Sequence, residues 1–451
     1  MRSFALVSAL AAVSAVQAGP TKRASITSVT TKGNAFFVGD DRFYIRGVDY
    51  QPGGSAANVD PLADKKICEP DIEKFKKLGV NVVRVYSTDN SLDHTDCMNA
   101  LSDAGIYVVL DANNPLYSIN RENPGPSYNA AYLQSVFATI DAFIKFDNTL
   151  GFFSGNEVIH DNKSTTLAAR YVKATTRDMR QYIRARGYRH ALVGYSAADV
   201  TDNRMQTAAY FNCGTDDERS DFFAFNDYSW CSSDFVTSGW DKKVQSFSGY
   251  GLPIFLSEYG CNANVRDFGE VNALMSDKMT SVYSGGLLYE YTYEENKYGI
   301  VNITTGRANL AGPRVELDEF AAFAKALKNN PAPTGTGGYN PSATSQPCPT
   351  KDTNWIVETT LLPALPDGAK KFLTEGAGKG PGLKGAGSQN AGGSSTTDAA
   401  PGSGTSGVTA GAAAGTSSKA AGVSLMAPLD KAPFIISGIV AFFTLAGAFA
   451  L

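Results

Sequence analysis

The sequence predicts an α/β protein built around a (β/α)8 barrel, the TIM-barrel architecture. Two observations carry this prediction. Apolar runs of strand length recur eight times, and each ends in polar or acidic residues. The segments between them, such as 71–80 and 165–187, have the apolar spacing and the helix-forming residues of amphipathic helices. Eight repeats of strand and helix indicate a closed parallel barrel. The apolar runs are residues 43–50, 80–87, 106–113, 150–157, 190–197, 221–228, 252–259 and 285–292.

A doubly wound open sheet is the alternative arrangement of such repeats. The sequence contains no glycine-rich phosphate-binding loop that would favour it. In a barrel, parallel strands are buried on both faces and therefore read as continuous apolar runs. Their C-terminal ends open on one face, where loops build the active site, so polar residues at strand ends are the first candidates for function.

Composition and charge restrict the function classes. The chain has 451 residues, of which 43% are hydrophobic and 19% are charged, so it can form a sizeable core. The formal net charge is −4 and no basic stripe stands out, which gives no basis for nucleic-acid binding. The 21 tyrosines and 25 phenylalanines suit a neutral, hydroxyl-rich ligand better than a phosphate.

Both ends of the sequence carry features typical of processing signals. Residues 1–18 combine Arg2, an apolar run and small residues ending at Ala18, which predicts a cleaved signal peptide rather than a buried helix. Residues 424–451 form a short polar spacer and an apolar tail. Small residues precede them, so we expect glycosylphosphatidylinositol (GPI) attachment near Gly422, with a tail-anchored transmembrane helix as the alternative.

Between these signals the composition changes twice. The predicted barrel occupies residues 25–330, and residues 331–375 form a Gly/Pro linker and a short ordered segment that contains Cys348. Residues 376–423 are mostly Gly, Ser, Ala and Thr with almost nothing to bury. We therefore expect a disordered stalk there, between the folded part and the anchor.

Six cysteines and two sequons are typical of an oxidising, secretory compartment. The even count favours three disulfides, and fifteen pairings are open. No Cys-x-x-Cys occurs and the three histidines are scattered, so the sequence predicts neither a metal site nor a cofactor. Asn162 and Asn302 begin Asn-x-Ser/Thr sequons and are the predicted glycosylation sites.

Two glutamates stand at the ends of predicted strands. Glu157 follows Asn156 at the end of the fourth strand, and Glu258 ends the seventh. These strands face each other across the mouth of an eight-stranded barrel. Glycoside cleavage with retention needs one acid to protonate the leaving oxygen and one carboxylate to attack the anomeric carbon. We assign proton donation to Glu157 and attack to an ionised Glu258, with Asn156 bonded to the sugar 2-hydroxyl.

Other charged residues at strand ends are secondary candidates. Asp111 ends the third strand, Asp227 follows the sixth and Glu290 lies on the eighth. They lack the placement of the two glutamates, so we expect them to bind substrate or to support the pair. Arg84 lies on the second strand, where its guanidinium either holds the carboxylate of Glu258 or forms a structural salt bridge.

Six motifs in order resemble the fungal cell-wall β-1,3-glucanosyltransferases of the Gas/Gel/Phr type, glycoside hydrolase family 72. The motifs are RGVDYQPGG, NVVRVYS, FFSGNEV, NDYSWC, LSEYGCN and GGLLYEYTYEENKYGIV. The resemblance covers the whole predicted barrel and the secreted, GPI-anchored layout. It implies an enzyme that cleaves β-1,3-glucan internally, keeps the donor part as a glycosyl-enzyme and transfers it to the non-reducing end of another glucan. Some members carry a Cys-rich carbohydrate-binding module after the barrel, which is not expected here because no cysteine follows Cys348.

The same resemblance makes Glu157 the proton donor and Glu258 the nucleophile, and it implies a set of substrate-binding residues along the mouth. Loop 113–121 is expected near the donor sugars. Aromatic faces together with amide, acid and guanidinium groups also suit a neutral glucan on chemical grounds. A tyrosine at a strand end is nevertheless often only a core residue with a solvated hydroxyl. The implied substrate-binding residues are Tyr86, Asp111, Asn114, Arg121, Asn156, Asp199, Arg204, Tyr228, Tyr289 and Tyr298.

The resemblance also supports one of the possible disulfide pairings. In it, one pair joins the segments that follow strands six and seven, one pair flanks the second strand, and the third ties the segment after the barrel back to the domain. The pairs are Cys68–Cys97, Cys231–Cys261 and Cys213–Cys348.

The prediction is thus a monomeric β-1,3-glucanosyltransferase with β-1,3-glucan as donor and acceptor, and without nucleic acid, metal or cofactor. A β-1,3-glucan hydrolase of the same barrel class is the alternative, because the cleaving residues would be the same and only the acceptor differs. A wall protein that binds glucan without turnover is a further alternative, but it would need one of the two glutamates to be absent or misplaced, and both are present. The end signals predict secretion and a GPI anchor on the outer face of the plasma membrane, or later transfer to the cell wall.

Overall fold

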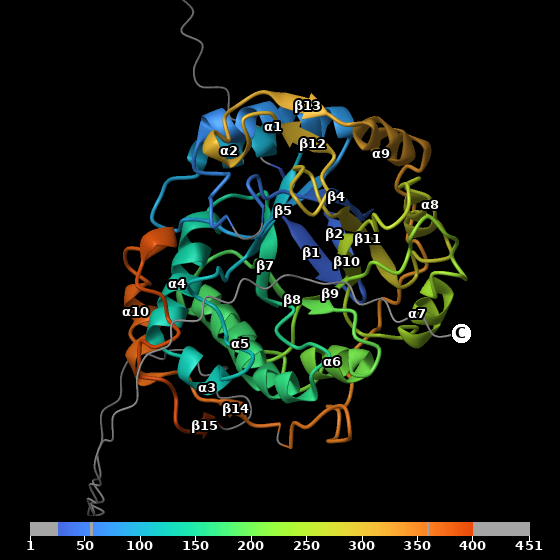
Figure 1. Cartoon of the computed structure of the whole chain (residues 1–451). Coiled ribbons are helices and arrows are strands. Elements are labelled where there is room, and N and C mark those ends of the chain that lie inside the picture. The colour runs from blue at the N-terminus through green and yellow to red at the C-terminus, as the bar shows by residue number, and fades with distance from the viewer. Residues whose placement is uncertain (1–25, 55–56, 359, 400–451) are drawn as a thin grey trace, which may run out of the picture. The chain divides into compact units, whose positions relative to one another are not determined.

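A closed barrel of eight parallel strands forms the centre of the protein (Figure 1). The computed structural model describes residues 26–54, 57–358 and 360–399. Each barrel strand overlaps one of the eight apolar runs of the sequence, so the predicted (β/α)8 fold is confirmed. The strands are β4 (Ile45–Asp49), β5 (Val82–Val85), β6 (Tyr107–Asp111), β7 (Thr149–Asn156), β8 (Leu192–Ala198), β9 (Phe222–Asn226), β10 (Ile254–Tyr259) and β11 (Tyr283–Leu288).

Helices alternate with these strands along the chain and cover the outside of the barrel (Figure 1). Local signals set their ends: Asp64 caps the first helix by accepting a hydrogen bond from the Lys66 amide, and Gly79 ends it in a left-handed conformation. The helices are α1 (Lys65–Leu78), α2 (Thr95–Asp103), α3 (Pro124–Ser127), α4 (Ala130–Phe143), α5 (Ala169–Ala185), α6 (Arg204–Phe211), α7 (Trp240–Ser246), α8 (Glu270–Leu274) and α9 (Asp318–Asn329).

A small antiparallel sheet closes the floor of the barrel. It consists of β1 (Val29–Lys32), β2 (Ala35–Val38) and β3 (Asp41–Phe43), which precede the first barrel strand. Phe36 is fully buried, and its ring centroid lies 6.1 Å from that of Phe222 and 5.9 Å from that of Phe255. Phe222 is the first residue of its strand, so the sheet seals the N-terminal end of the barrel and leaves the C-terminal end open.

A second antiparallel pair, β12 (Val301–Ile303) with β13 (Arg314–Glu316), lies between the last barrel strand and α9. The chain then runs along the outside of the barrel from residue 331 to residue 399 (Figure 1). Trp355 is fully buried there, and its ring centroid lies 5.2 Å from that of Tyr210, with the two rings tilted against each other. The further elements of this segment are β14 (Leu362–Pro363), α10 (Phe372–Glu375) and β15 (Asp398–Ala399).

The beginning of the predicted stalk lies on the folded domain. Ala377 and Ser388 are buried, and Asn129 donates a hydrogen bond to the Ser388 carbonyl at 2.7 Å. The short strands β14 and β15 pair with each other, so residues 376–399 return to the chain that precedes them. The folded part therefore extends to residue 399, beyond the boundary expected at residue 376. The rest of the predicted stalk, residues 400–423, lies outside the described residues.

The structure contains the three disulfides Cys68–Cys97, Cys213–Cys348 and Cys231–Cys261, which confirms the expected pairing. The pair that includes Cys348 ties the C-terminal segment to the end of α6, as predicted for a tethered segment. Within the described ranges, every helix is too short or too polar to span a bilayer. The predicted signal peptide, the attachment site near Gly422 and the tail 424–451 lie outside these ranges.

Candidate active site

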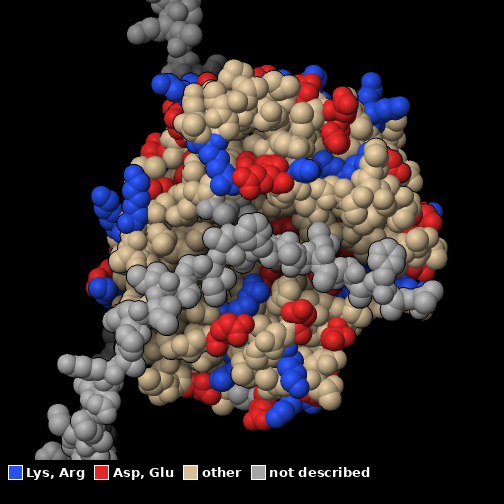
Figure 2. Space-filling view, in the orientation of Figure 1, with Lys and Arg blue, Asp and Glu red and all other residues tan. Residues whose placement is uncertain are grey.

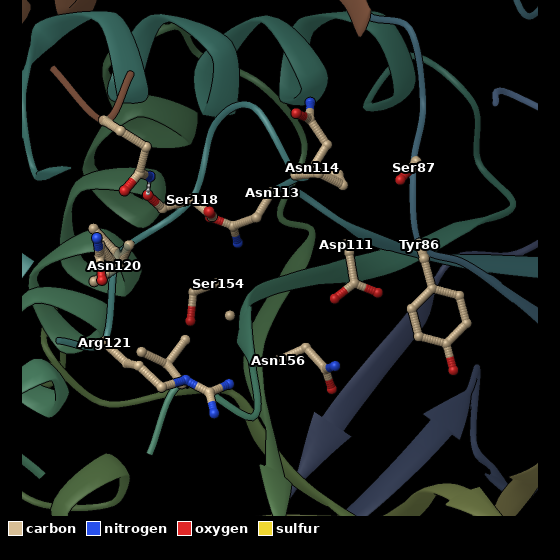
Figure 3. Close-up of a pocket in the computed structure, with 15 residues that line it drawn as sticks. Tyr86, Ser87, Asp111, Asn113, Asn114, Ser118, Asn120, Arg121, Ser154 and Asn156 are labelled. Carbon is tan, nitrogen blue, oxygen red and sulfur yellow. Dashed lines mark hydrogen bonds between the residues drawn. The ribbon is translucent and has the colours of Figure 1, made fainter. Parts of the chain in front are cut away.

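A pocket of about 560 Å³ opens at the C-terminal ends of β5, β6 and β7, where barrel geometry predicts the site. Loop 113–121, which follows β6, forms much of its wall (Figure 3). In Figure 3 the polar groups from these strands and from the loop surround one open space. Five of the predicted substrate-binding residues line it: Tyr86, Asp111, Asn114, Arg121 and Asn156.

The two glutamates occupy the strand ends that the sequence predicted. Glu258 lies in β10, the seventh strand of the barrel, and Glu157 comes directly after β7, the fourth. Asn226 lies beside both: its backbone pairs in register with Glu258, and its side chain donates a hydrogen bond to Glu157 Oε1 at 2.9 Å. The two carboxylates thus face the same part of the mouth.

Three hydrogen-bond donors surround the carboxylate of Glu258. Tyr86 donates to Oε1 at 2.8 Å, Tyr228 donates to Oε2 at 2.6 Å, and Arg84 Nη1 lies 3.3 Å from Oε1. Burial raises the pKa of Glu258 to about 7, while Arg84 and the two phenols oppose this by favouring the charged form. Both oxygens are held in place, which suits a carboxylate that must attack from a fixed position.

Glu157 sits at a sharp turn of the backbone. Its φ is +49°, in the left-handed region that a non-glycine residue rarely adopts and that costs on the order of 1–3 kcal/mol. Its amide donates to the Ser196 carbonyl at 2.9 Å, and its own carbonyl accepts from Arg121 Nη2 at 2.7 Å. These bonds hold the turn that directs the side chain of Glu157 toward the mouth instead of along the strand.

A network of amide and hydroxyl groups orients Asn156 beside Glu157. The Ser196 hydroxyl donates to Asn156 Oδ1 at 2.7 Å, and Asn226 Nδ2 lies 3.2 Å from the same oxygen. Ser257 in turn donates to Asn226 Oδ1 at 2.8 Å. Since the oxygen of Asn156 is already bonded within the barrel, its NH2 group is the part left to meet a ligand.

Arg84 both holds the carboxylate of Glu258 and forms a structural salt bridge, the two alternatives that the sequence left open. Besides its bond to Glu258, its Nε donates to Asp111 Oδ2 at 2.9 Å and its Nη2 to Asp111 Oδ1 at 3.3 Å. The guanidinium is fully buried, so the ion pair is also part of the barrel interior. Burial raises the pKa of Asp111 even though Arg84 opposes this shift.

Four half-buried tyrosines form an aromatic cluster over Glu258. The ring centroids of Tyr289 and Tyr298 are 5.3 Å apart, and Tyr228 lies 6.1 Å and 5.6 Å from them. Tyr86 lies 6.4 Å from Tyr289. The sequence predicted all four as substrate contacts, and the structure brings them together on one side of the mouth.

Asp199 and Arg204 pair with each other after β8. Arg204 Nε donates to Asp199 Oδ1, and Lys243 Nζ lies 2.6 Å from Asp199 Oδ2 and 2.5 Å from Asp227 Oδ2. Burial alone would raise the pKa of Asp199, but the two cations hold it below its usual value. This network of charged groups fixes the rim beside β8 and β9.

Glu290, the other acid considered from the sequence, is buried behind the cluster. Asn296 donates to its Oε1 at 2.7 Å, and burial raises its pKa to about 8. Asn226 and Lys243 were missed by sequence reasoning. Asn226 ends the sixth strand, and this position at a strand end could have marked it as a candidate site residue. Lys243 lies on a surface helix, and its contact with the site depends on how that helix packs against the barrel.

A parallel barrel with two glutamates at the ends of its fourth and seventh strands defines a class, the carbohydrate-active enzymes that work through a carboxylate pair. The sequence profile described as "Glucanosyltransferase" (Glyco_hydro_72) matches residues 18–329. The chain therefore belongs to this family.

Similar proteins include the 1,3-beta-glucanosyltransferase gel1 of Aspergillus fumigatus, which is 59% identical over 85% of each chain. The 1,3-beta-glucanosyltransferase gas4 of Schizosaccharomyces pombe is 50% identical over 79% of each chain. Among solved structures, a mutant of Saccharomyces cerevisiae Gas2p in complex with laminaritetraose and laminaripentaose superposes with a TM-score of 0.69. It is 39% identical and covers 76% of this chain and 75% of its own.

Proposed function

We propose that this protein is a retaining β-1,3-glucanosyltransferase that uses Glu258 as nucleophile and Glu157 as acid and base. The observation that carries the proposal is the different surroundings of the two carboxylates at one mouth. Glu258 is held by three donors that favour its ionised form, and Glu157 receives one neutral amide. One group is thus prepared to attack and the other to exchange a proton.

In the first step, Glu258 attacks the anomeric carbon of a β-1,3-linked glucosyl unit. The bond from that carbon to the glycosidic oxygen breaks, and Glu157 gives its proton to the departing oxygen. A covalent glycosyl-enzyme remains, and the reducing-end fragment leaves. The NH2 group of Asn156, directed outward by Ser196, is placed to hold the 2-hydroxyl of the reacting sugar.

In the second step, the hydroxyl at the non-reducing end of another glucan attacks the glycosyl-enzyme. Glu157, now ionised, takes the proton of that hydroxyl, and Glu258 is released as carboxylate. Two inversions give net retention, so a new β-1,3 bond replaces the old one. Water in place of the acceptor would give hydrolysis with the same residues.

β-1,3-Glucan as donor and acceptor is supported by the relatives and by the chemistry of the mouth. The relatives are named 1,3-beta-glucanosyltransferases, and the Gas2p structure holds laminari-oligosaccharides. Four tyrosines with amide groups offer flat apolar faces and hydrogen bonds, which is what a neutral sugar chain requires. Figure 2 shows Lys and Arg interspersed with Asp and Glu among wide areas of other residues, as suits an uncharged polymer.

Incubation with a reduced laminari-oligosaccharide, followed by separation of the products by size, tests the proposal. Products longer than the starting oligosaccharide are expected, together with shorter ones in equal number. Shorter products alone would mean hydrolysis, and no change in size would overturn the enzymatic proposal.

Attachment of the mature, monomeric protein to the outer face of the plasma membrane through a GPI anchor is part of the same proposal. The N-terminal apolar run, the small residues near Gly422 and the apolar tail support it. Release from intact cells by a phosphatidylinositol-specific phospholipase C is the expected result. Asn162 is exposed and Asn302 is half-buried, so both sequons are proposed to carry glycans, which a mass shift on glycosidase treatment would reveal.

A further inference from the structure

We propose that residues 381–391, called here the C-terminal strap, form one wall of the glucan groove, and that Gln389 hydrogen-bonds a sugar unit away from the point of cleavage. The inference rests on the proposed function and deepens it, because it adds a subsite made outside the barrel. The sequence placed this segment in a stalk, and nothing in the barrel motifs points to it.

The strap is hydrogen-bonded to loop 113–121, the wall of the main pocket. The Ser388 amide donates to the Leu116 carbonyl at 2.9 Å, and the Gly387 amide lies 3.3 Å from the Tyr117 hydroxyl. Gln389 Nε2 donates to the Ser118 carbonyl at 2.7 Å. These bonds fix the strap and the loop to each other, so the two act as one wall.

Two neighbouring hollows share residues of this wall. Gln389 lines the main pocket together with Asn156. A second hollow of about 320 Å³ lies between Pro115 on the loop and residues 386–391 of the strap, and it also includes Gln389. The two hollows share Pro115 and Gln389, so a ligand longer than the main pocket would meet Gln389 and the strap next.

The chemistry of Gln389 suits a hydroxyl ligand. Its NH2 group is engaged with the loop, and no hydrogen bond to its Oε1 is found among the described residues, so this oxygen can accept from a sugar hydroxyl. The side chain is half-buried, which shields such a bond from water. Asn113 and Asn120 line the same pocket with further amide groups.

The glycines of the strap permit its close approach to the barrel. A Cβ added at Gly385 would lie 2.1 Å from the Tyr117 hydroxyl, and one at Gly382 would lie 2.5 Å from Asp89 Oδ1. Gly385 itself has a φ of −69°, which any residue can adopt, so contact alone requires glycine there. A composition that is typical of disorder thus serves here to pack backbone against side chains.

Replacement of Gln389 by alanine in the full chain tests the subsite. The rate constant kcat/KM is measured for a series of reduced laminari-oligosaccharides of increasing length. We expect short substrates to react as in the unaltered protein, while long ones lose about three- to tenfold through a higher KM, the range for one hydrogen bond. Gln346→Ala, a change of the same kind in the same C-terminal segment but outside both hollows, should leave the length dependence unchanged.

Equal kcat/KM values for Gln389→Ala and the unaltered protein at every length would overturn the inference, as would an equal loss at every length. Absence of any cleavage or transfer by the unaltered protein would instead overturn the proposed function, so the two failures are distinguishable.

A second test displaces the strap without touching Gln389. Gly385→Ala is expected to lower kcat/KM for long substrates only, because its Cβ pushes against the Tyr117 hydroxyl. Tyr117→Phe removes that hydroxyl together with the long bond from the Gly387 amide at 3.3 Å, so the double variant should regain part but not all of the loss. A loss in Gly385→Ala that is the same for short and long substrates, or that Tyr117→Phe does not reduce, would contradict the strap as a wall of the groove.

Discussion

The two ends of the barrel are built from opposite chemistry. At the floor, Phe36 packs against Phe222 and Phe255. All three side chains are fully buried, and none carries a polar group that needs a hydrogen-bond partner. At the mouth, Glu157 and Glu258 are surrounded by amides, phenols and a guanidinium. The same eight strands connect both ends.

The difference teaches where stability and function are located in this fold. The floor gains free energy by removing apolar surface from water. The mouth contains a left-handed Glu157 and a buried carboxylate whose pKa is raised, and both features cost stability. Substitutions at the floor should therefore change the free energy of unfolding, and substitutions at the mouth should change the reaction.

The largest effect is expected from Glu258→Gln and Glu157→Gln. Each removes a group that reacts directly with the sugar, so transfer should fall by at least about 10³-fold. Product analysis with a reduced laminari-oligosaccharide measures it. Glu270→Gln is the control, because Glu270 is also a buried glutamate with a pKa of about 7 but does not line the pocket and, among the described residues, has no hydrogen bond to Glu157 or Glu258.

Folding should survive the change at Glu258. Its pKa is higher in the folded protein than in the unfolded chain, so the ionised carboxylate disfavours the fold increasingly as the pH rises from the unfolded value toward 7. Glu258→Gln is thus expected to keep or raise the Tm at pH 8. Substantial turnover in either catalytic variant would show that the assignment of that residue is wrong.

Phe36→Ala should destabilise the fold at the floor and leave the reaction at the mouth unchanged. Loss of a fully buried phenylalanine costs about 3–5 kcal/mol of unfolding free energy, measured by chemical denaturation. Phe36→Leu, which keeps most of the volume, should lose much less. The activity per folded molecule is expected to stay the same in both, and a change in KM or kcat in the folded fraction would mean that floor and mouth are coupled.

Asn226→Ala at the mouth and Asn148→Ala at the floor compare the two ends of the barrel with the same substitution. The Asn226 amide bonds both Glu157 and Asn156, so we expect a loss of about 10- to 100-fold in kcat/KM with a modest change in stability. Asn148 is also a buried asparagine, but it precedes β7 at the floor and bonds the Met98 and Ile106 carbonyls. Asn148→Ala should lower the Tm and leave kcat/KM unchanged; the reverse pattern would refute the division between the ends.

The smallest effect concerns the pH profile. Tyr228 stabilises the charged form of Glu258, so Tyr228→Phe should raise the pKa of Glu258 further. The reaction needs this carboxylate ionised and is lost as the pH falls through its pKa. The acid limb of kcat/KM is therefore expected to move to higher pH. Tyr298→Phe, in the same aromatic cluster, should not move it; an unmoved limb in Tyr228→Phe would exclude Glu258 as the group that titrates.

Much of this site was predictable because it follows from local pattern. Glu157 and Glu258 end apolar runs of strand length, and the order of strands in a closed barrel places such ends on one face. The partners within the site were less accessible. Lys243 lies on α7 yet reaches Asp199 and Asp227, and this pairing depends on how a helix packs on the barrel.

The sequence by itself determined the barrel, its open end and the two carboxylates, since apolar periodicity and strand ends are properties of short segments. The tertiary structure decided which groups act on those carboxylates, because Asn226, Tyr86 and Arg84 meet them only through strand register. It also decided that residues 376–399 pack on the folded domain. This glycine-rich segment has little to bury, so its composition predicts a stalk. The absence of Cβ atoms at its glycines is, however, what lets the backbone lie against loop 113–121.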